Sequence, residues 1–163
     1  MAALGRIMPN IGGPKSERGR ALHGVVQSVV LYEAPVWSEA VEISTYKRLM
    51  VRVDRTNLLR VACAYRTVSA AALWVITGCV PLHVLAGERA RIHSPRGRNI
   101  KEREMNEIRL AERLVSMGQW QQEWKATRDV AEWTKSLIPN LRSWVDCGHR
   151  QLDYLTQLLP FQV

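Results

Sequence analysis

Apolar residues recur along this chain at the three- and four-residue spacing that is typical of amphipathic helices. The first such pattern predicts a helix that Ser16 caps and that Ala34-Pro35 ends or kinks. Its apolar positions are Ala21, Leu22, Val25, Val26, Val29 and Val30. The segment before it, residues 1–15, contains Gly12-Gly13-Pro14 and is expected to be irregular.

A second helix is expected over about residues 43–63, with two different faces. Tyr46, Leu49, Met50 and Val53 fall on one face. At about 100° per residue, Arg48, Arg52 and Arg55 fall on the opposite face. The pattern therefore predicts a helix that carries a stripe of basic side chains.

A third and a fourth helix are predicted around the longest apolar run, residues 68–82. Thr67 or Ser69 can cap the third helix and Gly78 can end it. Pro81 can then occupy the first turn of a fourth helix that runs to about Ile92. Because the run is shorter than the roughly 20 residues that a membrane helix needs, we interpret it as a buried helix.

The best internal boundary is Ser94-Pro95-Arg96-Gly97-Arg98, where proline and glycine interrupt regular structure. Beyond this linker, residues 94–99, the spacing predicts one long helix over about residues 100–127. Trp120 and Trp124 lie one turn apart near its end. These two and the later Trp133 and Trp144 could stack on unpaired bases, but the one-turn spacing and the flanking Leu and Ile favour core packing. Shorter helices are expected over 129–137 and 151–159. The prediction is a mainly α protein with two helical segments, residues 16–93 and 100–163.

The charge of the chain favours a polyanionic partner. The formal net charge is +8, with a sequence pI near 9.9. Residues 41–98 hold ten Lys and Arg against three acidic residues, so almost all of the excess lies in this region. The candidate nucleic-acid-binding residues lie in this region, and the absence of glutamate partners at i+4 favours phosphate contact over a solvated face. They are Arg48, Arg52, Arg55, Arg60 and Arg66.

Neither a catalytic site nor a metal site is predicted. Two-metal catalysis needs carboxylates close together, whereas the four aspartates stand alone at positions 54, 129, 146 and 153. Cys79 with His83 and Cys147 with His149 are isolated pairs, while structural zinc wants four ligands. Common phosphate-loop, dinucleotide, hydrolase and zinc-protease motifs are absent.

The expected location is intracellular and away from membranes. The first residues lack the features of a signal peptide. The three cysteines are far apart and odd in number, so we interpret them as free thiols in a reducing compartment.

Several stretches, read in order, resemble one family. They are Arg6-Ile7-Met8-Pro9-Asn10-Ile11-Gly12-Gly13-Pro14, Leu31-Tyr32-Glu33-Ala34-Pro35-Val36-Trp37, Tyr65-Arg66-Thr67-Val68-Ser69, Gly78-Cys79-Val80-Pro81-Leu82, Trp120-Gln121-Gln122-Glu123-Trp124, Trp133-Thr134-Lys135-Ser136-Leu137-Ile138-Pro139 and Leu155-Thr156-Gln157-Leu158-Leu159. The series resembles the polyprotein of non-LTR (type-1) retrotransposable elements that insert into ribosomal RNA genes, in the segment after the polymerase palm. Glu33 stands where that family usually has Gly.

The resemblance implies a fold and a function. Residues 16–93 would be the helical thumb of a reverse transcriptase and residues 100–163 a helical connector behind it. The parent polyprotein would be an RNA-directed DNA polymerase and endonuclease, dependent on Mg²⁺ and active in the nucleus. This segment would carry no catalytic residue and would grip the RNA template and DNA primer or target, beside the remainder of the polyprotein.

A function of a different class is suggested by residues 67–92, which resemble a helix-turn-helix in outline. A free-standing DNA-binding module of that kind would recognise a specific duplex sequence. A purely structural helical module is the third hypothesis, and it predicts no binding beyond what net charge provides.

Overall fold

The computed structural model describes residues 16–94, 101–127 and 132–147, and within these ranges every regular element is a helix. The prediction of a mainly α fold is confirmed. The predicted lead-in (1–15), most of the linker (95–99) and the helix expected over 151–159 lie outside the described residues.

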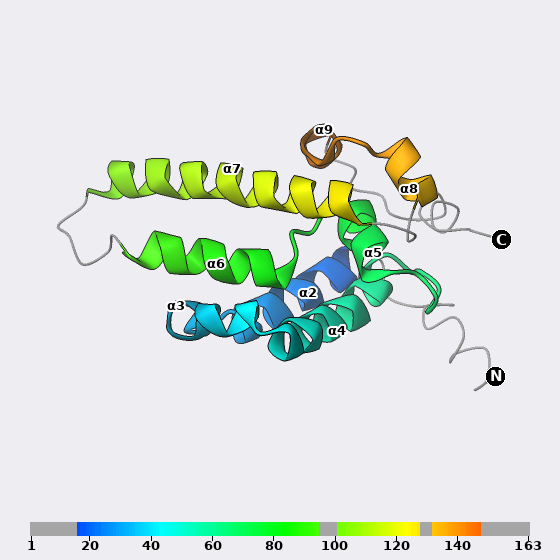
Figure 1. Ribbon diagram of the computed structural model, residues 1–163, viewed down its shortest axis with the longest axis horizontal. Helices are drawn as coiled ribbons and strands as arrows, with labels where there is room; N and C mark the ends of the chain where they lie inside the picture. The colour runs from blue at the N-terminus through cyan, green and yellow to red at the C-terminus, as the bar shows by residue number, and fades with distance from the viewer. Residues whose placement is uncertain (1–15, 95–100, 128–131, 148–163) are drawn as a thin grey trace.

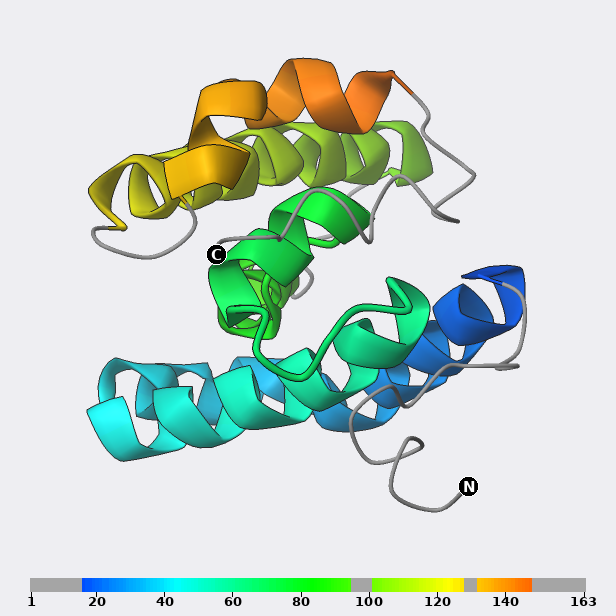
Figure 2. The same ribbon diagram turned by 90° about the vertical axis from the view of Figure 1, so that its right-hand side faces the viewer.

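The helices stack in layers, which Figures 1 and 2 show from two sides. One outer layer holds α2 (Ser16–Val30), α3 (Ala34–Trp37), the 3-10 helix η1 (Ser38–Glu42) and α4 (Ser44–Val61). In the middle are α5 (Ala70–Thr77) and α6 (Leu82–His93). The other outer layer holds α7 (Glu102–Ala126), α8 (Glu132–Leu137) and α9 (Leu141–Asp146).

Helices α2 and α4 run antiparallel and pack closely (Figure 2). A Cβ added at Gly19 would lie 3.1 Å from the Cα of Val61, so glycine permits this approach. The apolar positions that defined both amphipathic patterns nevertheless lie largely at the surface. The exposed ones include Leu22, Val25 and Val29 on α2 and Tyr46, Leu49 and Val53 on α4, each with 41–69% of its area accessible.

Helix α5 is the centre of the core, as the interpretation of residues 68–82 as a buried helix required. All its residues from Ala72 to Thr77 are buried. Ser69 Oγ accepts a hydrogen bond from Ala72 N (3.2 Å), and Gly78 ends the helix with φ 66°. Both predicted caps are therefore confirmed, with Ser69 rather than Thr67 at the N-cap. Pro81 directly precedes α6 rather than lying in its first turn.

Helix α7 is the predicted long helix, and its tryptophans belong to the core. Trp120 and Trp124 are 2% and 3% exposed, and Trp124 Nε1 donates to Ile138 O (3.0 Å). The short helix α9 was not predicted. Asn140 caps it by accepting from the backbone N–H groups of Arg142 and Ser143.

Residues on both sides of the predicted linker share one core. The cluster of buried apolar side chains includes Leu58 of α4 and Leu73 of α5 together with Trp120 of α7 and Leu141 of α9. Among the described residues, no single helix is long and apolar enough to cross a membrane, although α5 and α6, bent by 63° at the turn between them, pass together on length and composition.

Candidate nucleic-acid interface

Helix α4 carries two neighbouring exposed cations of the predicted set. Arg48 and Arg52 are both exposed and lie one turn apart. Neither guanidinium forms a hydrogen bond or ion pair with another described residue. The only acidic residue of α4 is Asp54, and it is buried. This side of α4 therefore presents positive charge that no carboxylate of the helix offsets.

Arg55 and Arg66 are placed differently. Arg55 is half-buried; its Nε donates to Val68 O (2.9 Å) and its Nη2 donates to Arg66 O. The guanidinium thus fastens the connection between α4 and α5, in which Arg66 is exposed. Phosphate contact by Arg55 stays a prediction, and it would have to coexist with these two backbone hydrogen bonds.

Arg60 is exposed in the last turn of α4. It follows Arg52 by eight residues, so it is turned by about 80° around the helix axis from Arg52. The predicted stripe is consequently a pair, Arg48 and Arg52, with Arg60 displaced toward the apolar side of the helix.

Asp54 organises the interior beneath α4. Its Oδ2 accepts hydrogen bonds from Trp74 Nε1 (2.6 Å) and from the backbone N–H of Leu82 (3.2 Å), which connect α4 to both α5 and α6. Burial raises the pKa of Asp54 to about 6, although both hydrogen bonds act in the opposite direction. Beyond the presence of an acidic residue within a helical pattern, nothing in the sequence indicates this role.

His23 of α2 faces Asp54. It is 4% exposed, and its Nε2 lies 3.9 Å from Asp54 Oδ1, too far for a hydrogen bond. Neither ring nitrogen has a hydrogen-bond partner among the described residues. Burial, and then the charge of Arg20, lower the pKa of His23, so the ring is neutral at pH 7 and this contact is not an ion pair.

A second polar cluster connects α4, α6 and α7. Lys47 Nζ lies 3.2 Å from Glu123 Oε1, and His83 Nε2 lies 2.8 Å from Glu123 Oε2. Burial acts to raise the pKa of Glu123, but the contacts from His83 and Lys47 outweigh burial and lower it. The Lys47 ammonium group is therefore paired with a carboxylate, unlike the guanidinium of Arg48, which follows it directly.

The chemistry-bearing residues do not assemble into a reaction centre in the described part of the chain. No group of three or more His, Cys, Asp or Glu side chains there could hold a metal ion. Cys79 Sγ contacts Thr77 O while His83 faces Glu123, so this isolated pair is divided between two structural contacts. Cys63, Cys79 and Cys147 form no disulfide with a described residue, which agrees with the prediction of reduced thiols.

The two outer tryptophans have different surroundings. Trp133 of α8 is 51% exposed. Trp144 of α9 donates from Nε1 to Val75 O (2.7 Å), which joins α9 to the central helix α5. Stacking on a base is therefore available to Trp133, whereas Trp144 is held against the core.

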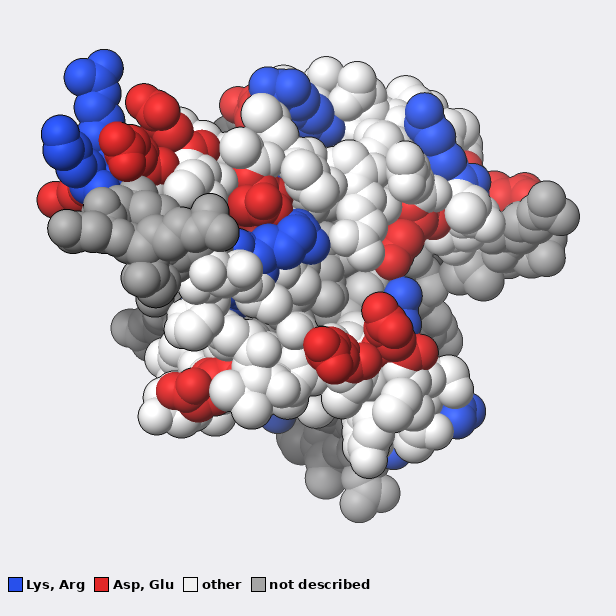
Figure 3. Space-filling model, turned by 60° about the vertical axis from the view of Figure 1, so that its left-hand side comes forward, with Lys and Arg blue, Asp and Glu red and all other residues white. Residues whose placement is uncertain are grey.

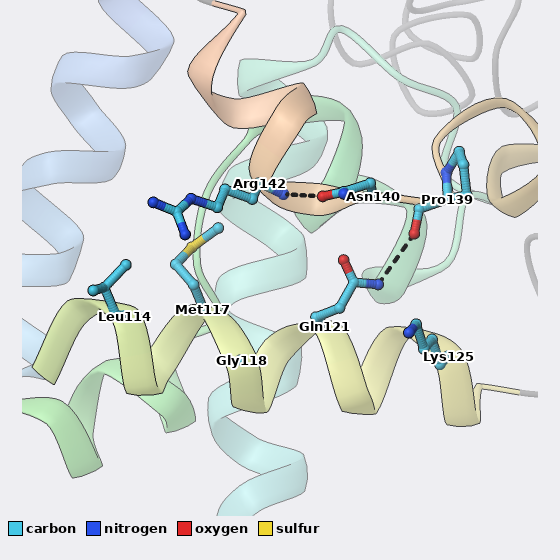
Figure 4. A pocket seen from close by; sticks show the side chains of 8 residues that line it. All are labelled: Leu114, Met117, Gly118, Gln121, Lys125, Pro139, Asn140 and Arg142. Carbon is cyan, nitrogen blue, oxygen red and sulfur yellow. Dashed lines mark hydrogen bonds between the residues drawn. The ribbon is translucent and has the colours of Figure 1, made fainter. Parts of the chain in front are cut away.

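A pocket of about 370 Å³ lies between α7 and the connection from α8 to α9 (Figure 4). Gln121 bridges its two sides: its Nε2 donates to Pro139 O (3.1 Å), and its Oε1 accepts from Leu141 N (2.8 Å). The lining includes Leu114 and Met117 but no carboxylate, histidine or cysteine. Its charged lining residues are Lys125 and Arg142, and we assign no reaction to the pocket.

Positive charge is dispersed rather than gathered on the face that Figure 3 shows. There, Lys and Arg side chains are separated by acidic and uncharged ones. The charged pairs of this protein include Arg91 with Glu112 (2.5 Å) and Arg113 with Glu88 (3.3 Å). Recognition of a polyanion would therefore depend on particular arginines without a carboxylate partner, such as those of α4.

The described residues define a basic, helical module with exposed arginines, and within them we identify no reaction centre. No protein-family model and no solved structure matches the chain. The chain is 28% identical over 154 residues to the 115 kDa protein in type-1 retrotransposable element R1DM of Drosophila melanogaster. That match covers 85% of this chain and 15% of the relative, so the chain spans a small part of a protein of a retrotransposable element to which it is distantly similar.

Proposed function

We propose that the chain is a segment of a retrotransposon polyprotein and that α4 holds the backbone of the template–primer duplex. The parent polyprotein would act in the nucleus as an RNA-directed DNA polymerase and endonuclease with Mg²⁺. The distant similarity to the retrotransposable-element protein supports this origin. We assign no catalytic residue to the segment itself; its part is to position nucleic acid.

The observation that carries the proposal is the Arg48 and Arg52 pair. Both are exposed on one helix whose only carboxylate, Asp54, is buried. Backbone phosphates are recognised by such cations without regard to base sequence. Arg60 and Arg66 extend the exposed basic surface, and Arg55 supports the connection next to it by its hydrogen bonds to Arg66 O and Val68 O.

The test is binding of a fluorescent RNA–DNA hybrid by the 163-residue chain and by R48A/R52A. Loss of two phosphate contacts should weaken binding roughly 30-fold at about 0.15 M salt, because each contact releases counterions. The matched control is R103A/R142A, which removes two exposed arginines from α7 and α9 and changes net charge equally. Equal weakening by both pairs would reduce the proposal to an effect of net charge.

The helix-turn-helix alternative requires an exposed recognition helix, whose N-terminal residues enter the major groove. In this fold the corresponding helix is α6, and its residues from Leu82 to Ala86 are buried. The alternative therefore lacks the surface that it needs. An unlabelled duplex of scrambled sequence separates the two hypotheses: it should compete fully with the labelled hybrid if α4 holds phosphates, and poorly if bases are read.

A further inference from the structure

A groove of about 750 Å³ lies away from Arg48 and Arg52, and no residue of α4 lines it. It is formed by the end of α2, the turn into α3, and the facing sides of α6 and α7. Its volume is within the range of about 300–1,000 Å³ that is usual for small-molecule sites. None of the residues predicted to bind nucleic acid lines this groove.

Arginines on two helices supply positive charge to the groove. Arg89 of α6 is exposed and has no ion pair with a described residue; Arg109 of α7 contacts only Asn106 Oδ1 (2.8 Å). Arg113 is paired with Glu88, which is 6% exposed, at 3.3 Å. Two guanidinium groups in one groove are therefore available to an anion, and a third is offset by a buried carboxylate.

An apolar floor and an aromatic ring accompany these cations. Leu31 and Leu85, which line the groove, are 2% and 8% exposed. Tyr32 is 72% exposed, and its backbone is held in place because Trp37 Nε1 donates to Tyr32 O (2.9 Å). Cations beside an exposed ring and an apolar floor are what an unpaired nucleotide requires, since its phosphate needs charge and its base needs a surface for stacking.

We propose that this groove holds a single-stranded stretch of nucleic acid, with phosphates on Arg89 and Arg109 and a base against Tyr32. The inference rests on the proposed function for the class of ligand, but it uses different residues and a different strand state. The carboxylate of Glu33, at the turn into α3, opposes binding there because it is exposed and lines the same groove.

The experiment measures the affinity of a fluorescent single-stranded RNA of eight nucleotides and, separately, of the RNA–DNA hybrid. R89A/R109A should weaken the single strand at least tenfold and the hybrid less than threefold. R48A/R52A should weaken binding of the hybrid more than binding of the single strand. R103A/R142A should change the affinity for either ligand little. Circular dichroism confirms that each variant is folded, and R89K/R109K should restore part of the affinity because it keeps the charge.

Two further variants test the ring and the carboxylate. Y32A should weaken the single strand at least about fivefold, the effect of losing one stacked base. E33Q removes a negative charge but keeps a side chain with a Cβ at this position of positive φ. It should therefore tighten single-strand binding two- to fivefold.

The outcomes separate this inference from the function proposed above. If R89A/R109A weakens the single strand no more than R103A/R142A does, the groove assignment is wrong, whatever happens to the hybrid. Equal losses for both ligands would also overturn it, because the groove would then belong to a duplex site. If R48A/R52A leaves hybrid binding intact while R89A/R109A abolishes single-strand binding, the α4 proposal fails and the groove stands.

Discussion

At the scale of single residues, the buried carboxylate of Asp54 makes stability depend on pH. Its pKa in the fold is about 6, above its ordinary value near 3.8, because burial disfavours the charged form. The folded state therefore binds the proton more tightly than the unfolded chain. The contribution of Asp54 is most favourable below about pH 4, declines as the pH rises to about 6, and is then constant.

The variant D54N should remove this decline. Its amide oxygen can still accept from Trp74 Nε1 and Leu82 N, and its NH₂ group can face the neutral ring of His23. We expect D54N to be more stable than the parent at pH 7 by roughly 2–3 kcal/mol, the cost of charging Asp54 in place.

Urea unfolding between pH 4 and pH 8 measures this difference. It should shrink toward zero at pH 4. The lowered pKa of His23 opposes folding below its ordinary value of 6.5, but both proteins share that trend. A difference that is the same at pH 4 and pH 8 would show that Asp54 keeps an ordinary pKa.

Glu33 stores strain in the backbone. Its φ of 50° lies in the left-handed region, at a position between α2 and α3. The family that this chain resembles usually has glycine there. Left-handed backbone costs an ordinary residue roughly 1–2 kcal/mol. E33G should therefore raise the free energy of unfolding by about 1 kcal/mol, while E33A, which keeps a Cβ, should not. A loss of stability in E33G would contradict this account of the turn.

At the scale of helices, hydrophobic spacing predicted where the helices lie in the sequence better than it predicted which side of each helix faces the core. In α4 the apolar stripe of Tyr46, Leu49 and Val53 is exposed, whereas the side that packs inward carries Asp54 and Leu58. A helical pattern with apolar residues on two sides does not determine which side faces the core. The packing of α2 and α5 against α4 decides it.

Two substitutions on α4 should therefore differ strongly in effect. L49Q replaces a side chain that is 52% exposed and should change stability by less than about 0.5 kcal/mol. L58A removes a fully buried side chain and should destabilise the fold by about 2–5 kcal/mol. Thermal or urea unfolding of both variants measures this contrast. A larger loss of stability in L49Q than in L58A would contradict the assignment of the Leu58 side of α4 to the core.

The helix ends could be predicted where a local mechanism fixed them. Ser69 and Gly78 bound α5 because a hydroxyl can accept a backbone N–H and glycine can adopt positive φ. Helix α9 escaped prediction because six residues are too few to establish a period. The hydrogen bonds of Asp54 and Arg55 could not be predicted, because their partners lie in α5 and in the connection before α5, which are distant in sequence.

At the scale of the whole molecule, the excess of positive charge is predictable from the sequence but its distribution is not. Hydrogen bonds to backbone oxygens engage Arg55, so the exposed part of the predicted stripe is the pair Arg48 and Arg52, with Arg60 displaced. Outside the stripe, ion pairs engage Lys47 and Arg113. The groove between α2, α6 and α7 was not predictable, since it joins arginines from either side of the proposed linker.

The most direct test of the central claim is the salt dependence of binding to the RNA–DNA hybrid. The logarithm of the association constant falls linearly with the logarithm of salt concentration, by about 0.9 for each phosphate contact. If Arg48 and Arg52 each hold a phosphate, the slope of R48A/R52A should be shallower than that of the parent by about 1.8. Identical slopes would contradict the assignment of the duplex backbone to α4.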